Sequence, residues 1–203
     1  MLRSERASRS RLGAAWCEQA GQRHGPYRQC FDDGRTMLLG AFRLGLEHGH
    51  WSWYYESGSP MQRGRFRQGE MEGRWRWWSA AGQRLGVGHF TGGQMTGRWM
   101  AWHSNGRLLY RGAYRNGEED GGWVGYYDNG RKAWQGQYRA RREEGRWTFW
   151  YRNGQRKRQG EFRNGYPVWP FSCWDRGGAK VVCDSRRLPS EFRAVAPPSL
   201  PPE

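Results

Sequence analysis

Glycine recurs every 24 residues along most of the chain, and no insertion breaks this period. A fixed period of this length indicates a repeat architecture, in which each unit is one supersecondary element that packs on its neighbours. Because one unit alone cannot bury its apolar side chains, neighbouring units must share a continuous core. The first glycine column consists of Gly25, Gly49, Gly73, Gly97, Gly121 and Gly145.

Aromatic residues keep the same period as the glycines. The 203 residues include 14 Trp, 10 Tyr, 8 Phe and 31 Gly, and isoleucine does not occur. A layered core of branched aliphatic side chains, which most enzyme folds use, is therefore excluded, and aromatic rings must form the core. The main tryptophan column consists of Trp51, Trp75, Trp99, Trp123 and Trp147.

Each repeat has the sequence pattern of a β-hairpin. Asn129-Gly130 and the equivalent pairs one repeat before and after it predict two-residue turns, because both residues tolerate positive φ. Counting outward from this turn places Trp123 opposite Gly136, where the indole would cover a backbone that has no side chain. The glycines that this count pairs with the tryptophan column are Gly64, Gly88, Gly112, Gly136 and Gly160.

Strand alternation then separates two faces of the sheet. The tryptophan column and its glycines share one face, which we expect to be the core. On the opposite face, the same count places Tyr126 opposite Ala133. This second face is amphipathic, and its aromatic residues are Tyr54, Trp78, Trp102, Tyr126 and Trp150.

These patterns predict an all-β fold, an elongated array of stacked antiparallel β-hairpins in a single twisted sheet. An isolated hairpin is marginally stable in water, so the hairpins must stack. We expect a basic leader and partial cap at residues 1–24 and six repeats at 25–168. A half-repeat cap at 169–187 and a disordered Pro-rich tail at 188–203 should follow.

The chain carries 34 Lys and Arg against 19 Asp and Glu, a net charge of +15. An arginine follows the second aromatic column in most repeats, so that stacked hairpins would present a guanidinium roughly every 10 Å. The second aromatic column consists of Phe42, Phe66, Phe90, Tyr114, Tyr138 and Phe162. This arginine ladder predicts a surface for an anionic partner, with the aromatic residues of the second face as interface anchors. The alternative is an ordinary solvated surface that acidic loops partly neutralise. The ladder consists of Arg43, Arg67, Arg115, Arg139 and Arg163.

The four cysteines lie at the two ends of the repeats. Cys17 could pair with Cys30, and Cys173 with Cys183, if the compartment oxidises thiols. Reduced thiols are the favoured alternative, because the N-terminal residues show no signal-peptide pattern. We expect a cytoplasmic protein, while the paired cysteines leave a secreted or periplasmic location open.

No motif for catalysis or for phosphate binding stands out from the repeat glycines. His24, His48 and His50 could approach one another near Glu47 or Glu72, but their spacing differs from that of zinc sites. We therefore expect no catalytic residue, no metal and no cofactor, and a protein that is not an enzyme.

The repeats resemble the MORN repeat variant of the bacterial YwqK-type antitoxin family over about residues 25–178. The sequences that carry this resemblance are GGWVGYYDNG with GQYRARREEG, and GRWTFWYRNG with GEFRNG. In this chain, Ala140 and Arg141 replace the Asn-Gly that is usual at the junction between units. The resemblance implies β-hairpin arrays, protein-binding or scaffold roles and an antitoxin or immunity role. For the broader MORN class it also implies association with anionic phospholipids.

Charge and resemblance together predict a binding module whose partner is an acidic protein, such as a cognate toxin. The alternative is an adaptor that binds anionic membrane lipids or nucleic acid.

Overall fold

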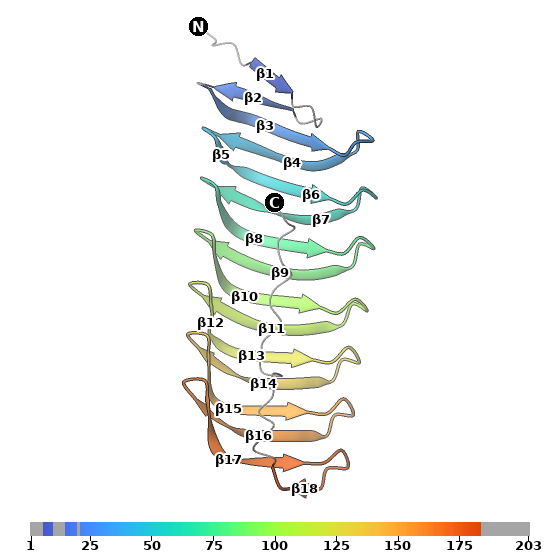
Figure 1. The fold of residues 1–203 in the computed structure, drawn as a ribbon, viewed down its shortest axis with the longest axis vertical. Coiled ribbons are helices and arrows are strands. Elements are labelled where there is room, and N and C mark those ends of the chain that lie inside the picture. Colours follow the sequence, from blue (N-terminus) through green and yellow to red (C-terminus); the bar gives the residue numbers. More distant parts are fainter. Residues whose placement is uncertain (1–5, 10–14, 20, 184–203) are drawn as a thin grey trace. The chain divides into compact units, whose positions relative to one another are not determined.

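A computed structural model of the chain describes residues 6–9, 15–19 and 21–183, with side chains for 21–183. The described residues form strands and turns and contain no helix, which confirms the predicted all-β fold. They belong to two compact units, Met1–Gln94 and Met95–Glu203. In each unit, consecutive antiparallel strands are joined by short turns (Figure 1).

Unit 1 contains hairpins whose neighbouring strands pair in sequence order. Its strands are β1 (Arg6–Arg9), β2 (Ala15–Gln19), β3 (Gln22–Cys30), β4 (Thr36–Arg43), β5 (Leu46–Glu47), β6 (Gly49–Tyr54), β7 (Pro60–Arg67), β8 (Glu70–Trp78) and β9 (Arg84–Thr91).

Unit 2 repeats the same arrangement. Its strands are β10 (Gln94–Trp102), β11 (Leu108–Arg115), β12 (Glu118–Glu119), β13 (Gly121–Tyr126), β14 (Lys132–Arg139), β15 (Arg142–Trp150), β16 (Arg156–Arg163), β17 (Tyr166–Trp174) and β18 (Lys180–Val181). The last hairpin, formed by β17 and β18, overlaps the range predicted for a C-terminal half-repeat. Residues 184–187 of that range and the predicted tail lie outside the described residues.

The tryptophan column forms the core, as predicted. Its members are at most 3% exposed, and each is the strand partner of the predicted glycine, as Trp123 is of Gly136. Tyr114 from the preceding hairpin packs edge-on against the Trp123 ring at a centroid distance of 5.1 Å. The indole N–H of Trp123 donates a hydrogen bond to the Ala113 carbonyl at 3.1 Å. Burying a ring of this size contributes strongly to stability, because each aromatic side chain removes about 150–250 Å² from water.

The indole covers a different glycine from the one that the sequence count indicated. A Cβ on Gly112, in the preceding hairpin, would come within 2.0 Å of the Trp123 ring. The same contact joins Gly136 to Trp147, where a Cβ would come within 2.1 Å. The cause is a bulge between hairpins: the pairing jumps between Gln135 and Gln137, so that three residues of β15 face one residue of β14. The glycines therefore let neighbouring hairpins approach, rather than the two strands of one hairpin.

The Asn-Gly turns inside the repeats are longer than predicted. Asn129 does not have positive φ, whereas Gly130 has a φ of 85°. The Gly130 N–H donates to the Tyr127 carbonyl, and the Tyr127 N–H donates to the Arg131 carbonyl, both at 2.8 Å. The loop thus has three residues and ends on a left-handed glycine, and the predicted two-residue turn is wrong.

A bulge close to this turn restores the predicted register in the middle of the hairpin. Tyr126 pairs with Lys132, and not with Ala133 as predicted, because β14 has one extra residue there. Beyond the bulge, Gly125 pairs with Trp134, in line with the sequence count.

Side chains at these turns link each repeat to the next. Asn129 Oδ1 accepts a hydrogen bond from the Arg131 N–H at 3.0 Å, and its Nδ2 donates to the Arg152 carbonyl at 2.8 Å. The Tyr127 hydroxyl donates to the Trp150 carbonyl at 2.7 Å. The repeated asparagine therefore satisfies both its own turn and the neighbouring one.

Two-residue turns with positive φ at both positions occur at the junctions between repeats. Asn164-Gly165 has residue types that tolerate this conformation, with φ values of 53° and 83°. Ala140-Arg141 adopts the same conformation, with φ values of 48° and 66°, although both residues have a Cβ that disfavours it.

Replacing Ala140 with Asn and Arg141 with Gly should therefore stabilise unit 2 by about 1.5 kcal/mol, because the left-handed conformation no longer opposes the side chains. Urea titration followed by tryptophan fluorescence measures the change. The reverse exchange, Asn164→Ala with Gly165→Arg, is the matched control and should destabilise by a similar amount. Equal stabilities for all three proteins would show that the junction turns store no strain.

Candidate functional site

The polar face of each unit is the face opposite the tryptophan column, and it carries the predicted binding residues. The ladder arginines are all exposed, and each is the last residue of its strand before a junction turn. Arg115 lies 2.8 Å from the Asp120 carboxylate. The other four, Arg43, Arg67, Arg139 and Arg163, form no ion pair with a described residue.

The predicted aromatic anchors lie at the other end of the strands, next to the turns inside the repeats. All five are half-buried. Cations of the protein itself already lie over two of their rings: Arg63 over Tyr54 at 5.7 Å and Lys132 over Trp150 at 5.6 Å. These two rings therefore hold cationic side chains in place, a role that the sequence did not predict.

Between the ladder and the aromatic residues, the polar face of unit 2 has an open hollow of about 820 Å³. Arg98, Arg111 and Arg146 line it around the smaller side chains of Ala113 and Val124. The arginines do not lie directly opposite one another across the strands, because Arg98 pairs with Ala113 and Arg111 pairs with Val124. The hollow thus combines spaced cations with a partly apolar floor.

The polar face of unit 1 has a smaller hollow of about 470 Å³ with a denser charge. Arg63 and Arg65 of β7 and Arg74 and Arg76 of β8 line it together. Arg63, Arg65 and Arg76 were not predicted from the sequence as binding residues. The alternating arginines of β7 would have revealed Arg63 and Arg65, since alternate residues of a strand share a face.

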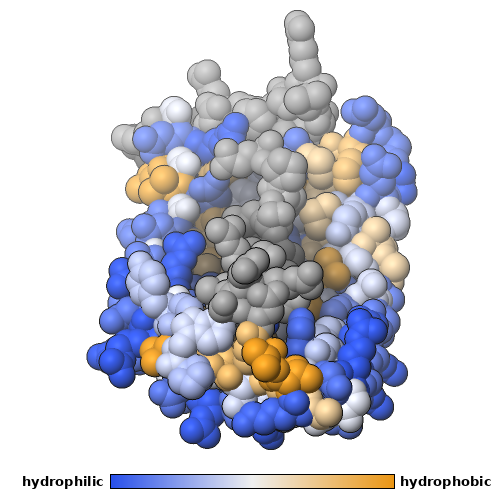
Figure 2. Space-filling model, turned by 60° about the horizontal axis from the view of Figure 1, so that its bottom comes forward, coloured by the Kyte–Doolittle hydropathy of each residue, from blue (hydrophilic) through white to orange (hydrophobic). Residues whose placement is uncertain are grey.

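Unit 2 also exposes hydrophobic residues. Figure 2 shows hydrophobic residues (orange) among hydrophilic ones (blue) in the lower part of the view. The exposed hydrophobic residues of unit 2 include Tyr166, Val168, Trp169, Val181 and Val182.

The Glu143 carboxylate of unit 2 lies near a junction turn and is partly buried, which disfavours its charge. Burial raises the pKa of Glu143, with a smaller contribution from the Glu119 charge. Burial, followed by the same Glu119 charge, also raises the pKa values of the Tyr110 and Tyr114 hydroxyls. Ionised Glu143 is therefore disfavoured in the folded state.

Replacing Glu143 with Gln should stabilise the protein at neutral pH. A folded-state pKa above the unfolded value means that folding loses stability as pH rises through the folded pKa. The advantage of the Gln variant should be below ~1 kcal/mol because water screens a half-exposed group, and it should vanish as pH falls below the ordinary glutamate range. Thermal unfolding at several pH values measures it, with the exposed Glu161→Gln as control. A pH-independent difference would contradict the assignment.

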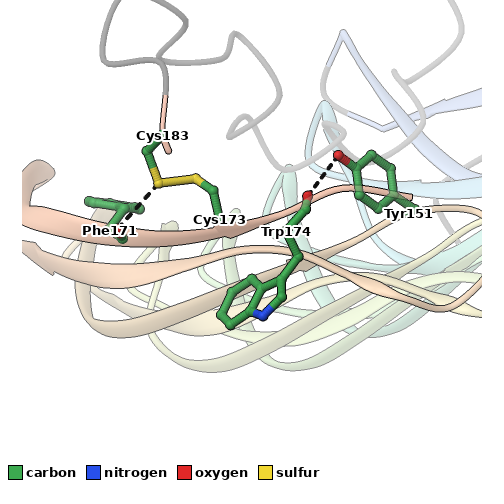
Figure 3. The surroundings of a disulfide bond; sticks show 5 residues. All are labelled: Tyr151, Phe171, Cys173, Trp174 and Cys183. Carbon is green, nitrogen blue, oxygen red and sulfur yellow. Dashed lines mark hydrogen bonds between the residues drawn. A yellow bond between two sulfur atoms is a disulfide. The ribbon is translucent and has the colours of Figure 1, made fainter. Parts of the chain in front are cut away.

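A disulfide joins Cys173 to Cys183 and closes the last hairpin, with the two Cα atoms 5.3 Å apart. Figure 3 shows Cys173 and the Trp174 indole on opposite sides of β17. Cys183 Sγ also lies 3.2 Å from the Phe171 carbonyl. The structure therefore has a disulfide at this pair, and not the reduced thiols that the sequence favoured.

The bridge considered between Cys17 and Cys30 does not form. Cys30 has a free thiol. In the backbone register, Cys17 pairs with His24, which lies six residues before Cys30 on β3. The side chain of Cys17 lies outside the described residues.

Metal-binding residues do not cluster in the part of the chain with described side chains: no three His, Cys, Asp or Glu residues come together there. The Leu44 N–H donates a hydrogen bond to His24 Nδ1 at 3.4 Å. Among the described residues, no helix is long and apolar enough to span a bilayer.

Comparison with known families finds two matches to the MORN repeat variant, at residues 47–68 and 143–164. The two matches have the same phase within the 24-residue period. They cover the hairpin of β6 and β7 and most of the hairpin of β15 and β16. MORN repeats are generally associated with binding to membranes or proteins. No curated protein matches the chain.

Proposed function

We propose that the protein is a non-enzymatic binding module that captures an acidic protein on the polar face of unit 2, as antitoxin and immunity proteins capture their targets. The observation that carries this proposal is the row of exposed ladder arginines. Arg139 and Arg163 are not neutralised by any described carboxylate. An exposed row of cations, of which only Arg115 has an ion-pair partner among the described residues, attracts anionic surfaces and raises association rates.

The remaining features of this face fit a protein partner. Arginine and aromatic side chains carry most of the binding energy in protein interfaces. The hollow of unit 2 combines arginines with the apolar Met100 and Val124, so that a partner could bury apolar surface between its acidic side chains. An open hollow of this kind does not isolate a reaction from water, which supports binding rather than catalysis.

The proposal is tested by replacing Arg115, Arg139 and Arg163 with Gln. Binding of a Glu-rich 20-residue peptide should weaken at least ~10-fold, since charge-assisted hydrogen bonds are lost. Surface plasmon resonance measures the affinity. The matched control replaces the same three residues with Lys, which retains the charge and should retain most of the binding. Unchanged affinity in the Gln variant would refute the role of the ladder.

Salt dependence separates this function from an adaptor for nucleic acid or lipid. Binding to an acidic protein with apolar contacts should keep much of its affinity at moderately high salt. Binding to a single-stranded oligonucleotide or to anionic vesicles depends on counterion release or surface potential and should fall steeply. Tighter binding to either of these probes than to the acidic peptide at moderate salt would contradict the proposal.

A further inference from the structure

The hollow of unit 1 places four arginines on two neighbouring strands. Arg63 and Arg65 come from β7, and Arg74 and Arg76 come from β8. All four side chains are exposed. The 470 Å³ of open space between them is large enough for a compact ligand.

Two of these arginines face each other directly. Arg63 and Arg76 are cross-strand partners, and like charges in this position destabilise a sheet. None of the four arginines forms an ion pair with a described residue. Glu72 also lines the hollow, and its Oε2 accepts a hydrogen bond from the Gly92 N–H at 3.1 Å. Glu72 is also the cross-strand partner of Arg65, so that one carboxylate faces four arginines. The hollow therefore keeps an excess of positive charge, which favours binding of an added anion.

The positive charge is local. Along the same row of the sheet, Ser52 pairs with Arg63 on one side, and Val87 pairs with Arg76 on the other. A polymer with one charge per residue needs a continuous series of cations, which this row lacks on both sides. The arrangement suits one compact group that carries more than one negative charge.

A phosphate monoester has these properties. It carries a charge of roughly −1.5 to −2 at neutral pH, and its three oxygen atoms accept several hydrogen bonds at once. Guanidinium groups donate two parallel hydrogen bonds to such oxygens. The Arg63 guanidinium lies over the Tyr54 ring at 5.7 Å, a contact that restricts its motion.

We propose that the hollow formed by Arg63, Arg65, Arg74 and Arg76 binds the phosphate of a phosphorylated side chain on the acidic protein partner. This inference rests on the proposed function and makes it more specific: the partner binds most tightly after phosphorylation. Within unit 1, the ladder arginines Arg43 and Arg67 recognise general acidic character, whereas the hollow recognises the phosphate.

Two peptides with the same Glu-rich sequence test the inference, one with phosphoserine and one with serine at the central position. Calorimetry should give at least ~10-fold tighter binding for the phosphoserine peptide than for the serine peptide. In the Arg63→Gln/Arg76→Gln variant, this ratio should fall to within about twofold. The matched control, Arg98→Gln/Arg111→Gln, removes the same charge from unit 2 and should keep the ratio. Near-UV circular dichroism verifies that both variants fold.

The two measured quantities keep the proposals apart. Affinity for the serine peptide tests the proposed function, and the phosphoserine-to-serine ratio tests the hollow. A ratio near one in the unsubstituted protein, or a ratio that survives the Arg63→Gln/Arg76→Gln exchange, would overturn the inference. Tighter binding to an oligonucleotide, or to vesicles with phosphate-bearing headgroups, that depends on the same two arginines would assign the hollow to another class of ligand and overturn it as well.

Discussion

Replacing Trp123 with Ala is expected to lower the free energy of unfolding by about 4 kcal/mol, in the range typical of a buried tryptophan. The side chain is completely buried. It packs edge-on against Tyr114 and Tyr138, at centroid distances of 5.1 and 6.0 Å. Its removal would leave a cavity between two hairpins that share this ring, and the bulged backbone around it has little freedom to close the space.

The matched control for this prediction is Trp169→Ala, because Trp169 is 42% exposed at the end of unit 2. The same chemical change there should cost only about 1 kcal/mol, since much of the ring is already in water. Denaturant titration of both variants, followed by circular dichroism, gives the comparison. Similar losses for the two variants would mean that the tryptophan column is not the core of the hairpin array.

The register of the hairpins could be predicted because the period of glycine and tryptophan is unbroken. Trp123 and Gly136 are strand partners, as the sequence count required. The turn type could not be predicted from Asn129-Gly130. Asn129 forms hydrogen bonds with the backbone of Arg131 and Arg152 and does not adopt a left-handed conformation. Residue preference alone does not distinguish these two uses of asparagine. The bulge between Gly125 and Tyr126 offsets the extra loop residue, so that the predicted strand register is correct although the predicted turn length is wrong.

The ladder arginines were predictable because they follow the repeat period. For the hollow of unit 1, the alternating arginines of β7 indicate one charged strand face, but not that Arg76 of β8 lies opposite Arg63. Neither residue belongs to a periodic column, and the bulge at Gly64 decides which residues line the surface together. The prediction of which glycine each indole covers was wrong for the same reason. Sequence counting gives the strand partner of each tryptophan, whereas the bulge brings its ring against a glycine of the preceding hairpin. Side-chain contacts could therefore not be predicted from the sequence wherever a bulge interrupts the regular pairing of two strands.

The bulge between β14 and β15 brings Gly136 into contact with the Trp147 indole. Replacing Gly136 with Ala should destabilise the protein by about 3 kcal/mol, at the upper end of the cost of overpacking a core. The new Cβ would lie 2.1 Å from the Trp147 indole, which is only 1% exposed and is held by Tyr138 at 5.0 Å. The indole cannot move away without separating neighbouring hairpins.

Gly122→Ala is the matched control, since a Cβ at Gly122 meets no atom within 4 Å and its φ is not positive. It should cost nothing and gain a few tenths of a kcal/mol from the less flexible unfolded chain. A double-mutant cycle then isolates the contact: in a Trp147→Ala background, Gly136→Ala should lose most of its cost, because the methyl group enters the space that the indole vacates. An undiminished cost in that background would show that the strand needs glycine for its backbone conformation, and that the tryptophan does not pack on it.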